Sequence, residues 1–137
     1  MNCPSEDIRH ILEAKDDSSG SYDLTFGTNL FIGKEPTTPK NCVTIYDTPG
    51  FAPYLGVDGS TGYEYPSIQI RVRNTSYVSG WNMINDIKSH LHGIKQATWN
   101  GTLYSVILCS SDPALLDWDD NGNARFICNF NIQRRPV

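Results

Sequence analysis

The sequence lacks the features of three broad classes of protein. No apolar stretch approaches the roughly 20 residues that a membrane-spanning helix needs, so we expect no membrane association. The first residues, MNCPSEDIRHIL, contain no basic segment followed by an apolar one, so we expect no signal peptide. The formal net charge is -4, which disfavours binding to nucleic acid through bulk positive charge.

The four cysteines are few, widely spaced and form no CxxC motif. Without histidines at a matching spacing, they predict neither a zinc site nor a redox motif. We expect free thiols at Cys3, Cys42, Cys109 and Cys128, as is typical of a protein made inside a cell. Cys109 and Cys128 lie in apolar alternations, which favours small core residues.

Two short motifs resemble ligand sites but lack the residues that would complete them. The DTPG motif at 47–50 matches the DxxG corner of GTPases, yet the nearest P-loop candidate, 27–35, has its glycines one residue too far apart and ends on glutamate. We interpret DTPG as a turn at a strand end. Residues 117–122 match half of a calcium loop, but the twelfth position is Cys128. An acidic turn or interface loop is our interpretation, and an incidental weak cation site is the alternative.

Signals for catalysis are also missing. His90 and His92 lie at the end of a predicted helix, at a spacing that places their rings on different sides, so they suit the helix dipole rather than a metal. No serine or cysteine lies in a nucleophile motif such as GxSxG. We therefore predict no enzyme and no cofactor, although carboxylates that meet only in the fold would escape a reading of the sequence.

A strand, a turn and an amphipathic helix are clearly encoded over residues 65–93. Ile68, Ile70 and Val72 alternate with polar residues, which predicts a strand with one apolar face and one exposed basic face. Asn-Thr-Ser at 74–76 offers N-cap oxygens, and Gly93 is a natural end of the helix. Apolar residues at spacings of three and four predict its buried face: Val78, Trp81, Ile84, Ile87 and Leu91.

The remaining patterns predict an α+β fold. We expect a first helix over 4–15, and strands over 22–32 (with a kink near Gly27), 42–46, 94–99, 103–109 and 125–133. Asn100-Gly101 predicts a hairpin, and 125–133 should run antiparallel to 103–109. Residues 47–65 read as a long exposed loop and 112–120 as a connection. About six strands and two helices indicate one domain over 1–137, with the helices packed on one face of a mostly antiparallel or mixed sheet.

Four segments, taken in order, resemble one family. VTIYDTPG (43–50) leads into a Gly/Pro-rich loop, and YEYPSIQIRVR (63–73) gives an aromatic–proline start to an alternating strand that ends in arginine. The next helix closes on LHG (91–93). SDPALLDWDDNGNARFICNFNIQR (111–134) combines Asp-Pro, an acidic Asn-Gly turn and Asn-Phe before arginine. With the short first helix, this order resembles the minor capsid or tail-completion proteins of long-tailed bacteriophages, and among them the tail terminators of lambda-like phages.

This resemblance, which covers nearly the whole chain, implies a structural role in the virion. Tail terminators have a sheet flanked by helices, and they form a hexameric ring that caps the tail tube, stops its growth and presents a face to the head connector. The implied partners are further copies of the chain, the tail tube protein and the connector or neck proteins, assembled in the host cytoplasm. DNA would pass through the ring without sequence-specific recognition, and the family brings no enzymatic activity.

A closed ring needs two different contact patches on each subunit. Our hypothesis pairs Arg71 and Arg73 of one copy with Asp117, Asp119 and Asp120 of its neighbour, because opposite charges are separated in the sequence. The alternative is that both arginines are simply solvated.

Exposed aromatic residues of the 47–65 loop are our candidates for docking on the tail tube or the connector. Packing of this loop on its own domain is the alternative. The aromatic candidates are Phe51, Tyr54, Tyr63 and Tyr65, and Arg134 and Arg135 near the C-terminus complete the candidate interface.

Other functions stay open at this point. A head-closure or other neck adaptor, or a monomeric binding module, would share the α+β plan, and the oligomeric state separates the module from a ring. A small metal- or nucleotide-dependent enzyme is a third alternative. A thermal-shift screen addresses it, because a specific ligand stabilises the native state.

Overall fold

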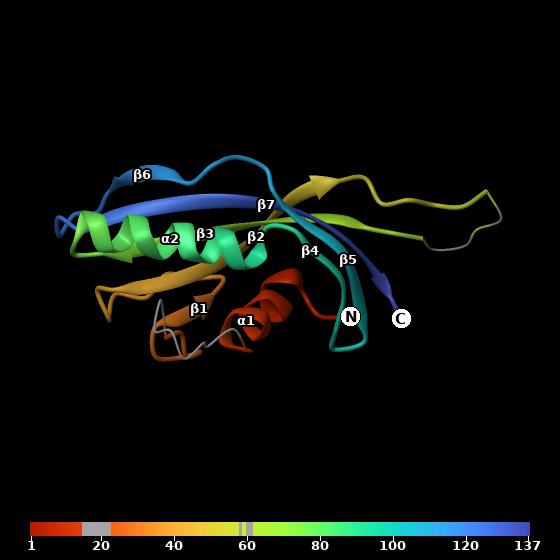
Figure 1. Ribbon diagram of the computed structural model, residues 1–137, viewed down its shortest axis with the longest axis horizontal. Helices are drawn as coiled ribbons and strands as arrows, with labels where there is room; N and C mark the ends of the chain where they lie inside the picture. The colour runs from red at the N-terminus through yellow and green to blue at the C-terminus, as the bar shows by residue number, and fades with distance from the viewer. Residues whose placement is uncertain (15–22, 58, 60–61) are drawn as a thin grey trace.

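A single sheet of seven strands forms the body of the protein in a computed structural model, which describes residues 1–14, 23–57, 59 and 62–137 (Figure 1). Within those residues there are two helices, α1 (Pro4–Ala14) and α2 (Tyr77–Leu91). The strand order is β1-β2-β3-β7-β5-β4, and β6 pairs with β7 outside this path. The strands are β1 (Leu30–Ile32), β2 (Cys42–Phe51), β3 (Tyr65–Asn74), β4 (Ile94–Trp99), β5 (Thr102–Cys109), β6 (Ala114–Trp118) and β7 (Ala124–Pro136).

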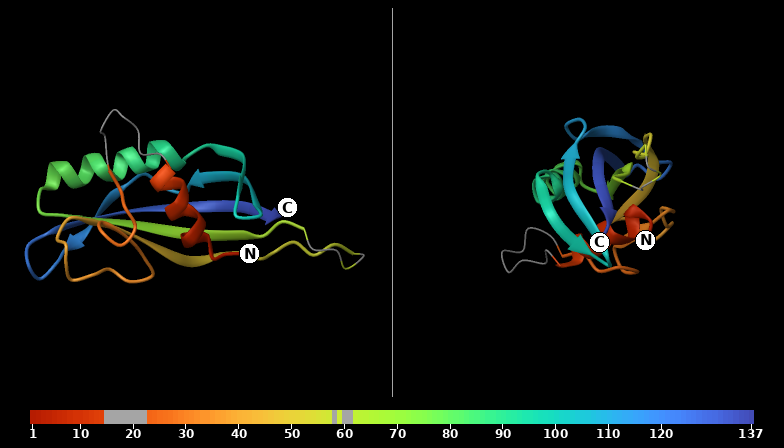
Figure 2. Two further views of the ribbon diagram at one scale, coloured as in Figure 1. Left: turned by 90° about the horizontal axis from the view of Figure 1, so that it is seen from below. Right: turned by 90° about the vertical axis from the view of Figure 1, so that its right-hand side faces the viewer.

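The sheet is mixed, since β1 and β2 are parallel while the other strand pairs are antiparallel. Figure 2 shows that it curls strongly when viewed along its length. The prediction of an α+β fold with a mostly antiparallel or mixed sheet is confirmed. The predicted hairpin is also confirmed, with Asn100 and Gly101 at positive φ in its turn, and so is the antiparallel pairing of β5 with β7.

One face of the sheet carries the core. Alternate residues of the three central strands are fully or almost fully buried and lie opposite each other, as in the pairs Val43–Val72, Ile45–Ile70 and Ile68–Phe130. Both helices pack on this face, through Ile8, Ile11 and Leu12 of α1 and Ile84, Ile87 and Leu91 of α2. Each such side chain stabilises the fold by about 1.5–3 kcal/mol through the removal of apolar area from water.

The start of α2 differs from the prediction. Val78 and Trp81 are 66% and 40% exposed, whereas Gly80 is buried. A Cβ at Gly80 would lie 2.7 Å from Cε2 of Phe126, so the helix approaches the sheet through its backbone here. This close contact places Gly80 on the buried side of the helix with Ile84, so Val78 and Trp81 on either side of Gly80 face outward.

The predicted loop over 47–65 is wrong in part, because strands extend into it from both sides. β2 continues to Phe51, which pairs with Tyr65, and the register shifts between Thr48 and Phe51. Proline is tolerated here because β1 pairs only with 43–45, so this part of β2 needs no further donor on that side. A Cβ at Gly50 would lie 1.9 Å from the carbonyl oxygen of Tyr65, so the close approach requires glycine.

Two further predictions need correction. The strand expected over 22–32 shortens to β1 and is preceded by a turn at 27–29. Lys15, the last residue of the expected first helix, and Tyr22, the first residue of this expected strand, lie outside the described residues. The connection expected over 112–120 contains β6, which pairs with the first part of β7. All five residues of β6 are exposed, so its sequence shows no alternation that would have predicted a strand. The cysteines are free, as expected.

No helix in the described ranges is long and apolar enough to cross a membrane.

Candidate assembly surfaces

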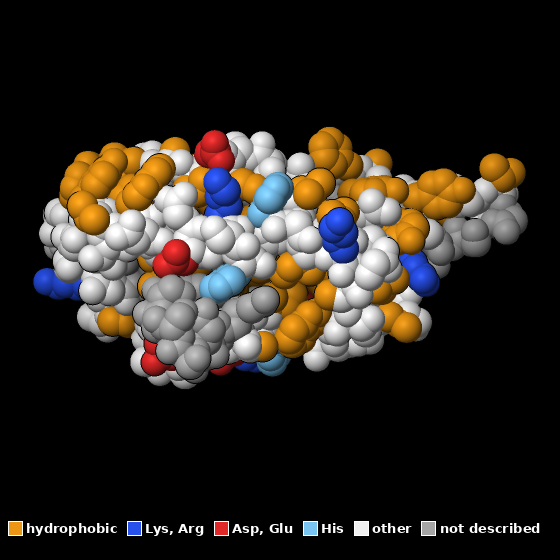
Figure 3. Space-filling model, viewed as in Figure 1, with side chains coloured by type: hydrophobic (Ala, Val, Ile, Leu, Met, Phe, Trp, Pro, Cys, Tyr) orange, Lys and Arg blue, Asp and Glu red, His pale blue; other side chains and the backbone are white. Residues whose placement is uncertain are grey.

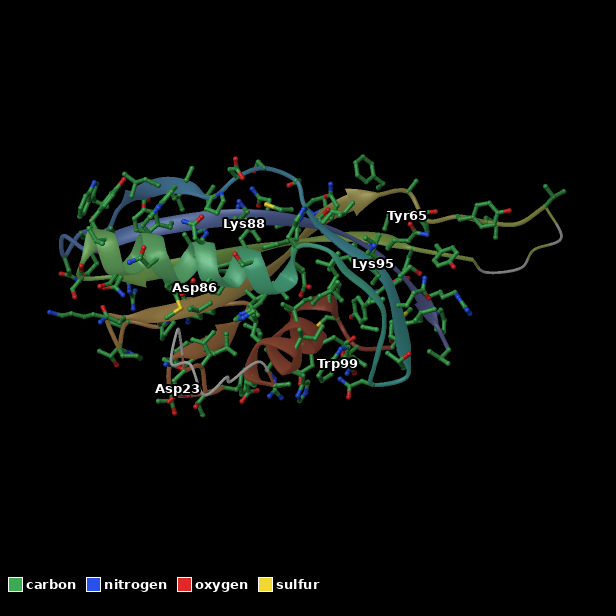
Figure 4. The ribbon with its side chains drawn as sticks, in the orientation of Figure 1. Asp23, Tyr65, Asp86, Lys88, Lys95 and Trp99 are labelled. Carbon is green, nitrogen blue, oxygen red and sulfur yellow. The ribbon has the colours of Figure 1, made fainter. Side chains whose placement is uncertain are left out.

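The residues predicted to form an interface divide between two ends of the sheet. Between β2 and β3 the chain projects from the body as a narrow extension, which we call the arm and define as residues 51–57 and 62–64 (Figure 1). At the other end lies the turn over 117–123, which we call the acidic turn. Figure 4 labels Tyr65 where the arm leaves the body.

Arg134, a candidate interface residue from the sequence, lies at the root of the arm and is only 6% exposed. Its Nε donates to Oε1 of Glu64 at 2.6 Å, and its Nη1 donates to the carbonyl of Asn2 at 2.9 Å. The backbones of Glu64 and Arg134 also exchange two hydrogen bonds. Arg134 therefore fixes the arm root to the end of β7 and to the start of the chain.

A buried carboxylate completes this cluster. Asp7 is fully buried, and it accepts hydrogen bonds from Tyr104 Oη, from Nδ2 of Asn100 at 2.7 Å and from Nδ2 of Asn2 at 3.2 Å. Nη1 of Arg134 lies 4.0 Å from Oδ2 of Asp7. Burial and the bond to Asp7 raise the pKa of Tyr104, so its hydroxyl stays a donor. This network joins α1, β5 and β7 at one point.

Arg73 is also buried, at 8% exposed, so the expectation of an exposed side chain is wrong. Its Nη1 forms an ion pair with Oε1 of Glu35 at 3.0 Å, and this oxygen accepts no hydrogen bond among the described residues. Its Nε and Nη2 donate to carbonyls of the loop that precedes β2, at residues Lys40, Pro36, Pro39 and Thr37. Arg73 thus holds this loop against the sheet.

Two carboxylates of the acidic turn, Asp117 and Asp119, already accept hydrogen bonds from residues of their own chain. Arg125 donates to Asp117 from Nε at 2.6 Å and from Nη2 at 2.8 Å, and its Nη1 donates to Oε2 of Glu35 at 3.3 Å. Hydrogen bonding to Arg125 holds the pKa of Asp117 below its usual range. Asp119 accepts from the backbone of Asn123, which likewise lowers the pKa of Asp119.

Arg71 keeps an accessible position on the sheet face opposite the helices. It is half-buried, donates to Oε1 of Gln69 at 2.8 Å and lies over the ring of Tyr46, 4.9 Å from its centroid. Gln69 in turn donates to Asn129 on β7 at 3.1 Å. The basic, hydrogen-bonding face predicted for this strand is therefore present at Arg71 and its neighbours.

The arm exposes apolar and aromatic side chains. Phe51 is 71% exposed and Tyr54 is 56% exposed, and they are followed by Leu55 at 71% and by Val57, which is fully exposed. The two sides of the arm are joined where the amide of Tyr54 donates to the carbonyl of Tyr63 at 3.0 Å. Phe51 and Tyr54 therefore offer free surface at this end.

Around the arm root the other predicted residues differ in exposure. Tyr63 and Tyr65 are half-buried. The exposed Arg135 lies over Tyr63, with its guanidinium 5.9 Å from the ring centroid.

A second apolar surface, which the sequence did not indicate as an interface, lies at the end opposite the arm (Figure 3). Tyr77 stacks on Trp118 with ring centroids 6.0 Å apart, and it packs edge-on against Phe126 at 5.0 Å. We call this surface the terminal patch. Its exposed members come from the start of α2 and from β6: Tyr77, Val78, Trp81, Leu115, Leu116 and Trp118.

A groove lies between α1 and β4, and Figure 4 labels Trp99 and Lys95, two of its lining residues. It is lined mainly by apolar side chains, from Ile11, Ala14, Ile94, Lys95, Ala97 and Trp99. This groove is a further apolar surface, but it is recessed, whereas the apolar side chains of the arm project from the body.

The motif that resembled a GTPase corner has a structural role. Asp47 accepts hydrogen bonds from the amide of Ser5 at 2.9 Å and from the Ser5 hydroxyl at 2.7 Å, at the start of α1. A carboxylate at this position stabilises the helix N-terminus. In the part of the chain that the structure describes, no three His, Cys, Asp or Glu side chains come together as a metal site.

The chain is similar to known proteins both in sequence and in fold. A family model described as "Bacteriophage tail terminator protein" matches residues 17–135. A chain from a solved structure titled "Virion of native gene transfer agent (GTA) particle" is similar in fold, with a TM-score of 0.63 and 10% identity over 96% of this chain and 94% of that one. No curated protein sequence shows significant similarity. The chain belongs to the bacteriophage tail terminator family and is thus a structural protein of the phage tail, located in the virion.

Proposed function

We propose that this chain forms a hexameric ring at the head-proximal end of the phage tail, where it ends the growth of the tail tube and provides the surface that joins tail to head. The family match over residues 17–135 supports this role. The observation that carries the ring is the separation of two unlike surfaces, the arm and the terminal patch, at opposite ends of the sheet. A ring closes only through such heterologous contacts between copies.

The burial of individual side chains refines the proposed contact surface. Arg71 and Arg135 stay in it as accessible cations, Asp120 stays as an exposed carboxylate, and Asp119 stays as a half-buried one. Arg73 and Arg134 act instead by holding loops and the arm root in place, because both are almost fully buried. The partners that we propose are further copies of the chain, the tail tube protein and the connector.

Light scattering across protein concentration and Mg²⁺, with negative-stain images of the same sample, tests the ring. We expect a particle of six times the 15.3 kDa of one chain, with a central hole. The tube-ending role is tested by adding the protein to polymerising tail tube protein, which should give shorter tubes with the ring at one end. Chains that stay monomeric both alone and with tubes would contradict the proposal.

A further inference from the structure

Exposed apolar side chains concentrate at the two ends of the molecule. Of the fourteen large apolar or aromatic residues exposed in the described ranges, six belong to the terminal patch and four to the arm. Isolated exposed residues of this kind are ordinary, whereas a contiguous group indicates an interaction surface. Figure 3 shows both groups, over the start of α2 and along the arm. Each end therefore presents a surface suited to another protein.

The edge of β6 gives the terminal patch a second property. Among the described strands β6 pairs only with β7, so the backbone groups on its outer edge have no strand partner. All five of its residues are exposed, including Leu115, Leu116 and Trp118. An apolar edge strand of this kind invites pairing with another chain, and native proteins usually cover it. The terminal patch therefore offers both apolar side chains and free backbone groups.

Charge makes the two ends complementary. Exposed Asp120 and half-buried Asp119 lie beside the terminal patch, whereas exposed Arg135 lies beside the arm root, over Tyr63. Unlike charges at the two ends favour contact between the arm end of one copy and the patch end of the next. The arm points away from the body at the far end from β6, so it cannot reach the patch of its own chain (Figures 1 and 2).

We propose that the arm of one copy docks on the terminal patch of the next copy. Phe51, Tyr54 and Leu55 would cover the aromatic cluster and lie along the outer edge of β6, while Arg135 would face the acidic turn. This inference rests on the proposed ring and names the two surfaces that close it. It assigns the arm to a neighbouring copy of the chain rather than to the tail tube.

Two single substitutions disable the two surfaces separately. Leu55→Asp charges the arm at a side chain that is 71% exposed, and Val78→Asp charges the patch at one that is 66% exposed. Val78 is the second residue of α2, where a carboxylate suits the helix dipole, so the fold should be kept. Leu108→Asp is the matched control, since Leu108 is 44% exposed on β5 and belongs to neither surface.

We expect each of the two variants to weaken association between copies by about tenfold or more, and the control to assemble as the wild type does. An equimolar mixture of Leu55→Asp and Val78→Asp should give a complex of twice the 15.3 kDa chain mass and nothing larger. The reason is that each mixed pair retains one intact contact, from the arm of the patch variant to the patch of the arm variant. Light scattering measures all three results.

A photo-crosslinker in place of Leu55 identifies the partner directly. We expect crosslinks to peptides that contain residues 77–81 or 114–118 of another chain. If the wild type forms rings but the crosslinks fall elsewhere, or if Val78→Asp still forms rings, the docking proposal is wrong while the ring stands. Crosslinks to added tail tube protein alone would assign the arm to the tube. A wild type that never associates would overturn the ring and the docking together.

Discussion

The two ends of the sheet each contain an almost fully buried arginine, but the two arginines bind different kinds of partner. Arg134, at the arm root, contacts side chains of separate elements, namely Glu64 and Tyr104, and lies near the buried Asp7. Arg73, toward the acidic turn, donates mostly to carbonyls of one surface loop and pairs with Glu35. One arginine therefore belongs to a network inside the domain, whereas the other fastens a loop to it.

This difference predicts unequal costs of disruption. Removing one partner from a buried network leaves charges and donors without water or protein to satisfy them, which is strongly destabilising. Carbonyls of a surface loop can turn to water once their donor is lost, so the cost there is smaller. The arm end should accordingly be the more rigid end of the sheet.

Asp7→Ala is expected to have the largest effect. It leaves Tyr104 and Asn100 without their acceptor and removes the carboxylate near Arg134, so we expect a loss of about 3–5 kcal/mol in the free energy of unfolding. Urea denaturation measures this loss. The matched control is Glu6→Ala on the same helix, whose side chain is 28% exposed and pairs with Arg9, for which we expect about 0–1 kcal/mol. Equal effects of the two variants would remove the basis of the comparison.

Arg73→Met is expected to cost less, about 2–3 kcal/mol, because only Glu35 is left as a charge with little exposure. The loop over 35–41 should become more susceptible to protease, since its carbonyls lose their common donor. Limited proteolysis and urea denaturation together measure the two effects. Arg71→Met, on the same strand, is the control and should leave the loop resistant. A cost as large as that of Asp7→Ala would make the two ends equivalent.

Gly50→Ala probes the arm end through the backbone instead of through charge. A Cβ would lie 1.9 Å from the carbonyl oxygen of Tyr65, so the two strands must separate at the point where the arm begins. We expect a loss of about 1–3 kcal/mol, the usual cost of overpacking, and a change in amide exchange confined to β2 and β3. Thr48→Ala, two residues earlier, should change neither. Unchanged exchange in Gly50→Ala would show that the arm root tolerates displacement.

Most strands could be predicted because their buried and exposed residues alternate along the sequence, so the pattern is visible without knowledge of tertiary contacts. β7 alternates between core and polar face along most of its length. Asn100-Gly101 specifies the turn between β4 and β5 by backbone conformation alone. β6 could not be predicted, because a strand exposed on both faces has no apolar alternation to detect. Its existence depends on pairing with β7, which is a tertiary contact.

The candidate surfaces were harder to predict than the strands, for a related reason. A polar alternation does not distinguish an exposed arginine from one such as Arg73, whose acceptors lie 33 to 37 residues away in the chain. The helical periodicity placed Val78 and Trp81 in the core because it cannot show that Gly80 meets Phe126. The exposure of Phe51 and Tyr54, by contrast, was one of the two alternatives that their position among Gly and Pro residues left open.

The smallest expected effect is a pH dependence at the acidic turn. Hydrogen bonding to Arg125 lowers the pKa of Asp117 in the folded chain, and hydrogen bonding to Asn123 does the same for Asp119. The unfolded chain therefore binds these protons more readily, so the stabilisation is complete at neutral pH. It is lost as pH falls below about 4, through the lowered folded values.

Thermal denaturation of the wild type and of Asp117→Asn from pH 7 to pH 3 tests this dependence. We expect the wild type to melt a few degrees higher at neutral pH, because the bidentate contact with Arg125 is intact, and the gap to close in the acid range. Asp120→Asn, which changes an exposed neighbour in the same turn, is the control and should melt with the wild type at neutral pH. A gap that persists unchanged at pH 3 would mean that Asp117 contributes through packing rather than through its charge. In that case the difference in stability between the two ends of the sheet would come from packing, and the ionisation of Asp117 at the patch end would not contribute to it.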